Sequence, residues 1–140
     1  MEYSKLFSPI KIGNVEIKNR ICMAPMLMDF GQFDGRTTEQ LMNYYEERAK
    51  GGTGLIVTEI TRVNDIHGGS AFAQLGMSHD YQIEGMSELA KRIHKHGAKL
   101  FVQLHHPGRQ NMGLLIGTLP LSINCDKIIP FFKPMLYKVV

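Results

Sequence analysis

The segment AKLFVQLHHPGR (residues 98–109) is the most informative part of the sequence for the fold, because it contains an apolar run that abruptly turns polar. The apolar part is too short for a helix and follows Gly97, a pattern typical of a buried strand. The polar part brings together Gln103, two histidines, a proline and a glycine. Such a cluster, placed where a buried strand ends, indicates a site.

Two earlier segments repeat the apolar part of this pattern. RICMAPM (residues 20–26) is stopped by Pro25, which cannot donate to a sheet ladder, and GLIVTEI (residues 54–60) is a β-branched run bounded by a polar loop. Helical periodicity separates the three runs. The order strand, helix, strand, helix, strand, with near-continuous apolar strands, predicts a parallel sheet with right-handed crossovers and the α/β class.

The two helices are predicted from their caps and apolar stripes. Thr37 and Gln40 have capping-box spacing for the first helix, which should stop at Gly51 and Gly52. Asp80 is expected to cap the second helix, and Gly97 to end it. The stripes comprise Leu41, Tyr44, Tyr45 and Ala49 in the first helix, and Ile83, Met86, Leu89, Ala90 and Ile93 in the second.

A hairpin is predicted ahead of the first strand. In IKIGNVEIK (residues 10–18), isoleucine and valine alternate with polar residues on both sides of Gly13 and Asn14, which form a Gly-first two-residue turn.

The position of the glycines distinguishes two kinds of parallel sheet. Both carry their sites at the carboxyl ends of the strands. A doubly wound nucleotide-binding sheet needs a glycine-rich turn after its first strand, but this chain has MLMD (residues 26–29) there. Gly51, Gly52 and Gly54 come before the second strand, at the opposite end. The sequence therefore favours a (β/α)8 TIM barrel, with the hairpin placed to close its bottom.

Composition argues against several classes of protein. With 140 residues, 44% hydrophobic and 21% charged, the chain can bury a core. The net charge of +3 comes from scattered Lys and Arg, so we expect no nucleic-acid partner. Cys22 and Cys125 lie far apart, which indicates neither a disulfide framework nor a zinc site, and suits a reducing cytoplasm. Without a signal-peptide pattern or a long apolar run, we expect a soluble protein and no membrane partner.

Three blocks together resemble the Old Yellow Enzyme family of flavin-dependent ene-reductases, which are TIM barrels. The blocks are LFSPIKIGNVEIKNRICMAPM, YYEERAKGGTGLIVTE and KLFVQLHHPGR, and they agree in order, spacing and identity over residues 5–110. Within the family, the chain is most similar to the bacterial NADH:flavin oxidoreductases related to 2,4-dienoyl-CoA reductase and bile-acid enone reductases.

This resemblance divides the chain into two regions. Residues 1–110 would form the amino-terminal hairpin and the first three of eight strands of a flavin-binding barrel. Residues 111–140, with Pro120, Pro130 and Pro134 and no sustained period, are expected to form an apolar loop or insertion. Because the sequence stops after an apolar stretch without a cap or closing element, we interpret it as a truncated fragment.

The resemblance also implies the residues that contact FMN. The end of the first strand would pack against the flavin ring, and Glu59 and Ile60 would border its pyrimidine. Gln103 carries an amide donor and acceptor, which complement the carbonyl and imide edge of the ring. The alternatives are a proline-terminated strand end, a Glu59 carboxylate bound to loop backbone, and a buried structural glutamine. The implied flavin contacts are Ala24, Pro25, Met26, Leu27, Glu59, Ile60 and Gln103.

The histidines do not indicate a metal site. On a strand, His105 shares the face of Gln103 whereas His106 points the other way, and His94 and His96 diverge on a helix. Arg109 could reach a flavin or form a structural ion pair. Some relatives carry a flavin-tuning cysteine where this chain has Leu27, so tuning by a thiol is not expected.

The implied reaction is hydride transfer from NADH or NADPH through FMN to the activated C=C bond of an α,β-unsaturated carbonyl or enoyl substrate. The catalytic residues are unknown, because the family's substrate-binding pair and proton donor have no counterpart here. Longer relatives add an iron-sulfur cluster and FAD. A homo-oligomer is an open alternative. Two other classes of function also stay open. One is a truncated, inactive chain that acts as a structural or interaction fragment, and the other is a small flavodoxin-type binding module, which would need a phosphate loop that this sequence does not show.

Overall fold

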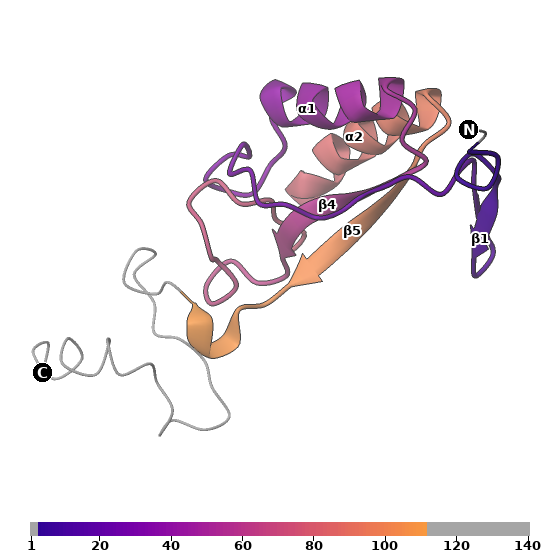
Figure 1. The fold of residues 1–140 in the computed structure, drawn as a ribbon. Coiled ribbons are helices and arrows are strands. Elements are labelled where there is room, and N and C mark those ends of the chain that lie inside the picture. The colour runs from indigo at the N-terminus through magenta and orange to yellow at the C-terminus, as the bar shows by residue number, and fades with distance from the viewer. Residues whose placement is uncertain (1–2, 112–140) are drawn as a thin grey trace, which may run out of the picture.

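The computed structural model describes residues 3–111, which form a three-stranded parallel sheet and two helices (Figure 1). The strand order is β3-β4-β5, and both neighbouring pairs are parallel, as predicted. The predicted region 111–140 lies, except for Asn111, outside the described residues. The elements are β3 (Cys22–Met23), α1 (Glu39–Lys50), β4 (Leu55–Arg62), α2 (Ile83–Lys95) and β5 (Lys99–His105).

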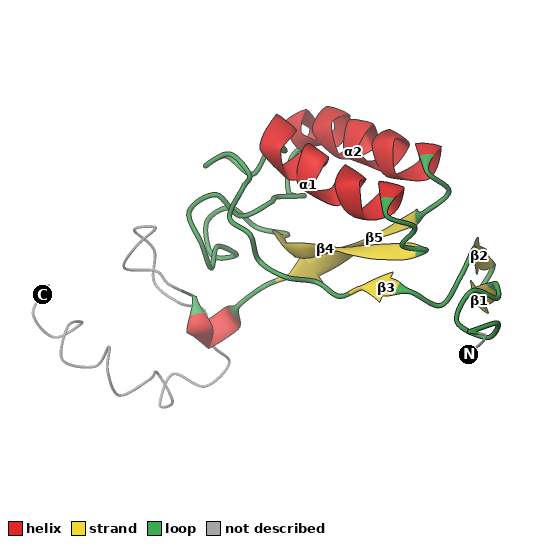
Figure 2. Cartoon of the chain, turned by 45° about the horizontal axis from the view of Figure 1, so that its top comes forward, coloured by secondary structure: helices red, strands yellow, loops and turns green. Residues whose placement is uncertain are grey.

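Both helices cover the same face of the sheet (Figure 2). The core lies between these two layers, where Leu41 and Tyr45 of α1 and Leu89 and Ile93 of α2 pack around Ile56 of β4. No helix of the described residues covers the opposite face of the sheet. That face carries the strand residues that do not point towards α1 and α2.

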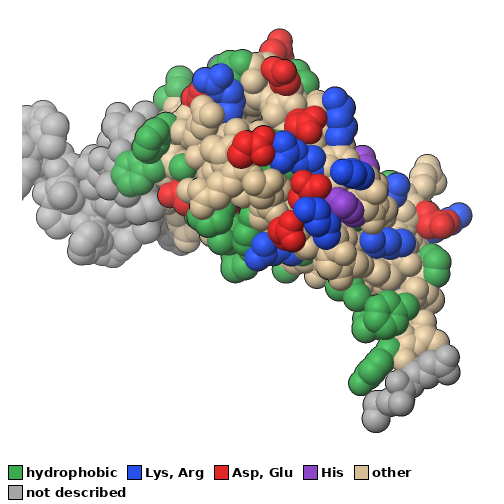
Figure 3. All heavy atoms as spheres, turned by 90° about the horizontal axis from the view of Figure 1, so that it is seen from above, with side chains coloured by type: hydrophobic (Ala, Val, Ile, Leu, Met, Phe, Trp, Pro, Cys, Tyr) green, Lys and Arg blue, Asp and Glu red, His purple; other side chains and the backbone are tan. Residues whose placement is uncertain are grey.

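The outer face of the helices is polar and of mixed charge (Figure 3). Arg92 of α2 forms an ion pair with Glu39 of α1, with 2.8 Å between Nη2 and Oε1, and a weaker one with Glu88. No helix within residues 3–111 is long and apolar enough to cross a membrane.

The N-cap of α1 lies one residue later than predicted. Thr38, not Thr37, is the N-cap: its backbone is extended, and its hydroxyl oxygen accepts a hydrogen bond from the Leu41 amide at 3.1 Å. The hydroxyl also donates to the Phe30 carbonyl, which ties the cap to the preceding loop. The helix ends at the predicted glycines, with Gly52 in the left-handed region at φ +99°.

The start of α2 also differs from the prediction. Asp80 opens a short 3-10 turn, Asp80–Gln82, and α2 follows it directly. Met86, Leu89 and Ile93 are buried as predicted, but Ile83 is 59% exposed. Ile83 is the first residue of the helix, and Met86, one turn later, is the first of the stripe to reach the core.

The hairpin lies at the amino ends of the strands. Strands β1 (Ile10–Ile12) and β2 (Val15–Ile17) pair antiparallel around a two-residue turn, with Gly13 at φ +56° as that turn requires. The chain leaving β2 binds the loops that precede β4 and β5: Asn19 donates to the Gly52 carbonyl and Lys18 to the His96 carbonyl. The hairpin thus lies opposite the strand ends where a site is expected (Figure 1).

A β-bulge interrupts the pairing of β4 with β5. Val57 pairs with Phe101 and Ile60 with Gln103, so β4 has one residue more than β5 between these pairs. Two buried hydroxyls compensate for the disrupted ladder. Thr58 Oγ1 accepts from the Gln103 amide at 3.2 Å, and the hydroxyls of Thr58 and Thr61 each lie 3.0 Å from the Glu59 carbonyl oxygen.

Candidate functional site

The segment after β3 forms an exposed apolar rim. Residues 24–27 are all exposed, including Met26 at 56% and Leu27 at 39%. A contiguous exposed apolar patch is a feature typical of surfaces on which a ligand or another part of a protein packs. The rim therefore offers apolar surface at the carboxyl end of the sheet.

Gln103 lies beside Ile60 on the uncovered face of the sheet. Leu100 and Val102 pack against the helical core, so strand alternation places Gln103 and His105 on the opposite face. Ile60 and Gln103 are partners in the register, and both are half-buried. Within residues 3–111, the side-chain amide of Gln103 makes no hydrogen bond. A free donor and acceptor beside an apolar rim fit the mixed polar and apolar surface of a flavin ring.

Glu59 is placed differently from its neighbour Ile60. Its side chain is fully buried, and its carboxylate accepts the Met28 amide at 2.8 Å (Oε2) and the Leu75 amide at 3.2 Å (Oε1). Its own amide donates to the Tyr45 hydroxyl at 2.7 Å. Burial raises the pKa of Glu59, and the hydrogen bonds from backbone amides partly oppose this shift. Whether Glu59 also borders a flavin stays a prediction.

Further contacts join the loop after β3 to the loop after β4. Asp29 Oδ1 accepts the Ala73 amide at 2.7 Å, and the Gly31 amide donates to the Ala73 carbonyl at 2.8 Å. A Cβ atom at Gly31 would lie only 2.5 Å from that carbonyl oxygen, so the close approach requires glycine. Asp29 itself has φ +57°, the one non-glycine residue in the left-handed region among the described residues.

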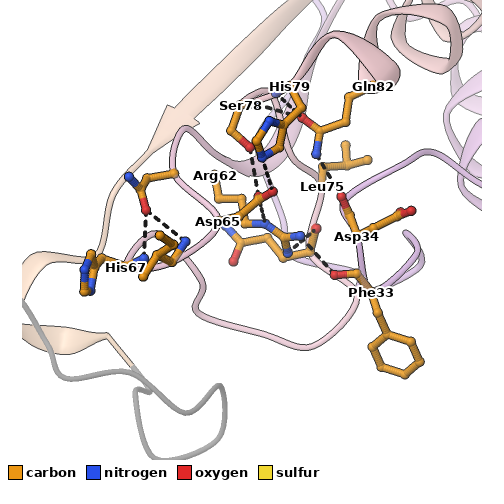
Figure 4. A network of polar contacts seen from close by, with 12 residues as sticks. Phe33, Asp34, Arg62, Asp65, His67, Leu75, Ser78, His79 and Gln82 are labelled. Carbon is orange, nitrogen blue, oxygen red and sulfur yellow. Dashed lines mark hydrogen bonds and ion pairs between the residues drawn. The ribbon is translucent and has the colours of Figure 1, made fainter.

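A buried arginine extends this connection (Figure 4). Arg62, the last residue of β4, is 6% exposed and reaches the Asp65 carboxylate at 2.8 Å, the Phe33 carbonyl at 2.9 Å and the Gln74 carbonyl at 3.2 Å. Burial alone would raise the pKa of Asp65, but hydrogen bonds from Arg62 and Ser78 outweigh it and lower the pKa. The sequence carries one signal for this network, a charged residue at the end of an apolar strand, and this signal does not predict the partners of Arg62.

His105 lies where strand alternation predicts, but His106 follows the last residue of β5 and does not point toward the helix layer as predicted. His105 is half-buried, and its Nδ1 has no hydrogen-bond partner within residues 3–111, whereas His106 is exposed. Burial is the main cause that lowers the pKa of His105, and the nearby His106 lowers it further. The side chain of Arg109 lies outside the described part of the structure. No group of three His, Cys, Asp or Glu side chains in the described residues is arranged to hold a metal ion.

Comparison with known proteins identifies the family. Residues 5–115 match the NADH:flavin oxidoreductase / NADH oxidase family. The chain belongs to this family. It is 40% identical to an NADH oxidase of Thermoanaerobacter brockii over 86% of its length, and 43% identical to an NADPH dehydrogenase of Listeria monocytogenes serotype 4b over 98%. The old yellow enzyme homologue from Zymomonas mobilis superposes on 86% of the chain with a TM-score of 0.78 and 32% identity.

These family members are longer than the chain. It spans 19% of the T. brockii protein, 42% of the Listeria protein and 33% of the Zymomonas enzyme. The resemblance to Old Yellow Enzyme is confirmed, and so is the fold class: a hairpin and about three of the eight strands of the family's (β/α)8 barrel. The finer placement beside 2,4-dienoyl-CoA reductase and bile-acid enone reductases stays a prediction.

Proposed function

We propose that this chain acts within a longer polypeptide, here called the complete protein, whose further strands close the barrel. The complete protein would be an FMN-dependent oxidoreductase that uses NADH or NADPH to reduce the activated C=C bond of an α,β-unsaturated carbonyl or enoyl compound. Family membership supports the flavin and the nicotinamide. The observation that carries the proposal is the side-chain amide of Gln103, which lies on the uncovered sheet face beside the apolar rim and has no hydrogen-bond partner within residues 3–111.

Gln103 would hold the polar edge of the flavin ring. An amide can donate and accept at once without carrying charge, so it suits an edge where carbonyl and imide groups alternate. Ile60, its partner in the register, would give the ring an apolar neighbour on β4. Ala24, Pro25, Met26 and Leu27 would pack on the ring from the end of β3 and exclude water from it.

A bound FMN would supply the redox chemistry, accepting a hydride from the nicotinamide and passing it to the substrate's β-carbon. The described residues would bind and orient the ring. The phosphate site in such barrels comes from the loops after the seventh and eighth strands, which this part of the chain does not include. The proton donor and the groups that bind the substrate carbonyl would also lie on later strands. An iron-sulfur cluster and FAD would belong to a longer form of the complete protein.

Substitution of Gln103 tests this function. In the complete protein, Gln103→Ala should weaken FMN binding by roughly ten-fold, because flavin polar groups would lose their partner at a cost of roughly 1–3 kcal/mol. The measurement is isothermal titration of the apoprotein with FMN.

Gln40→Ala is the matched control, because Gln40 is exposed on α1, which covers the face of the sheet opposite to Gln103. It should bind FMN like the wild type. Equal FMN affinity in the wild type and Gln103→Ala would contradict the assignment of Gln103, and a wild-type complete protein that binds no FMN would contradict the function itself.

A further inference from the structure

Glu59 is an unusual group for the place it occupies. Its carboxylate is fully buried, yet no Lys or Arg within residues 3–111 pairs with it. A buried carboxylate without a cation is costly unless hydrogen bonds compensate it. Here the compensation comes from the backbone amides of Met28 and Leu75, one on each carboxylate oxygen.

The two amides belong to different loops. Met28 follows the rim residues Met26 and Leu27 directly, whereas Leu75 lies in the loop between β4 and α2. Glu59 is in the bulge of β4, next to Ile60, which pairs with Gln103. One side chain therefore connects the central strand to both loops at the carboxyl ends of the strands.

We propose that Glu59 is a positioning residue that sets the rim against Gln103 by holding the Met28 amide, and not a group that touches the flavin. This inference rests on the proposed function, because the rim and Gln103 are its proposed ring contacts. Asp29 supports the same loop independently through the Ala73 amide. Glu59 and Asp29 together would fix the segment that turns the chain away from β3.

The surrounding hydrogen-bond donors favour the ionised carboxylate. Backbone amides donate to both of its oxygens, and protonation would replace part of its acceptor capacity with an O–H donor. Two titratable groups of the described residues face Glu59: Asp29 from the loop after β3, and the Tyr45 hydroxyl from α1. Burial raises the pKa of Glu59 most, and the negative charge of Asp29 raises it further. FMN affinity should therefore fall as the pH drops through a midpoint above the ordinary glutamate range.

Two substitutions in the complete protein separate this role from a general structural one. Glu59→Gln has one acceptor oxygen in place of two, so it should weaken FMN binding roughly ten-fold at neutral pH and abolish the acid step in affinity. Asp29→Asn keeps an oxygen for the Ala73 amide and tolerates the left-handed backbone, but removes the negative charge. It should move the acid step in FMN affinity to lower pH.

Glu84→Gln is the control, because it removes the same charge from an exposed position in the first turn of α2. It should leave both the affinity and the pH of the step unchanged. FMN affinity is measured by titration calorimetry across the acid range for all four proteins. A Glu59→Gln protein with wild-type affinity and the wild-type acid step overturns the proposal, as does an Asp29→Asn protein whose step does not move.

A second measurement does not depend on the flavin. The amide proton shifts of Met28 and Leu75, followed by NMR in the apoprotein, should titrate together at one midpoint, and Asp29→Asn should lower that midpoint. Independent titration of the two amides overturns the proposal even if Glu59→Gln fails to fold. If the wild type shows the joint titration but binds no FMN, the proposed function fails while the connection between the loops stands.

Discussion

At the scale of single residues, Tyr45 shows how the site depends on the core behind it. Its ring is buried in the helical layer, and its hydroxyl oxygen accepts the Glu59 amide in the bulge. Burial raises the pKa of Tyr45, so the phenol stays neutral at any physiological pH. One hydroxyl therefore links α1 to the bulge of β4.

Removing that hydroxyl should destabilise the protein. Tyr45→Phe leaves the buried Glu59 amide without an acceptor, at a cost of roughly 1–3 kcal/mol in the free energy of unfolding. Urea unfolding of the complete protein measures the loss. Tyr44→Phe is the control, because Tyr44 makes ring contacts with Phe30 and Arg48 but no hydroxyl hydrogen bond within the described residues. Equal unfolding midpoints for the two variants would contradict this role of Tyr45.

At single residues, the sequence predicts which side chains carry useful chemistry better than it predicts which groups those side chains contact. The amide of Gln103 could be singled out because it follows an apolar run that predicts a strand, and because its chemistry complements a flavin edge. The partners of Glu59 could not, because they are backbone amides 31 and 16 positions away, brought together by loops. Arg62 depends on loop carbonyls in the same way, and side-chain identity carries no signal for such partners.

At the scale of elements, the bulge in β4 positions both Glu59 and Ile60. The extra residue lets Glu59 turn into the loops while the next residue, Ile60, pairs with Gln103. Thr58 supports this arrangement by accepting the Gln103 amide, which the disrupted ladder would otherwise leave unpaired. The bulge was not predicted, because a run such as GLIVTEI has the same pattern with or without an extra residue.

Thr58→Val should weaken the bulge while keeping its shape. The isosteric valine removes the acceptor for the Gln103 amide, so we expect a loss of roughly 1–3 kcal/mol in stability and faster hydrogen exchange at that amide. Thr53→Val is the control, because the Thr53 hydroxyl makes no hydrogen bond within the described residues. Unchanged exchange at Gln103 in Thr58→Val would show that the hydroxyl does not support the bulge.

The boundaries of the elements were harder to predict than their order. Every predicted strand and helix in the described residues exists, because apolar periodicity reports burial directly. Thr37 and Thr38 are both suitable caps, and the choice of Thr38 depends on the distant Phe30 carbonyl. Ile83 has the spacing of the apolar stripe of α2, but it is the first residue of the helix and lies outside the core.

At the scale of the whole molecule, the sheet within residues 3–111 has one face that no helix covers and two edges that have no neighbouring strand. Helices cover one side of β3-β4-β5, and strands β3 and β5 each have one unpaired edge within the described residues (Figure 2). In a closed barrel the uncovered face becomes the packed interior, and the edges pair with further strands. The fold of residues 3–111 therefore presents surfaces suited to the rest of a barrel.

The isolated 140-residue chain should consequently neither hold FMN tightly nor oxidise NADH. Gln103, Ile60 and the rim would contact the ring from one side only, and the phosphate would have no loops after a seventh and eighth strand to bind it. Most of the binding energy would be missing, and the uncovered face should drive self-association. Isothermal titration with FMN, an NADH-oxidation assay and light scattering on the purified chain, with the complete protein as the positive control, measure these expectations. Stoichiometric binding at micromolar FMN with turnover would show that three strands suffice, and that the ring contacts alone carry the affinity assigned here to the whole barrel.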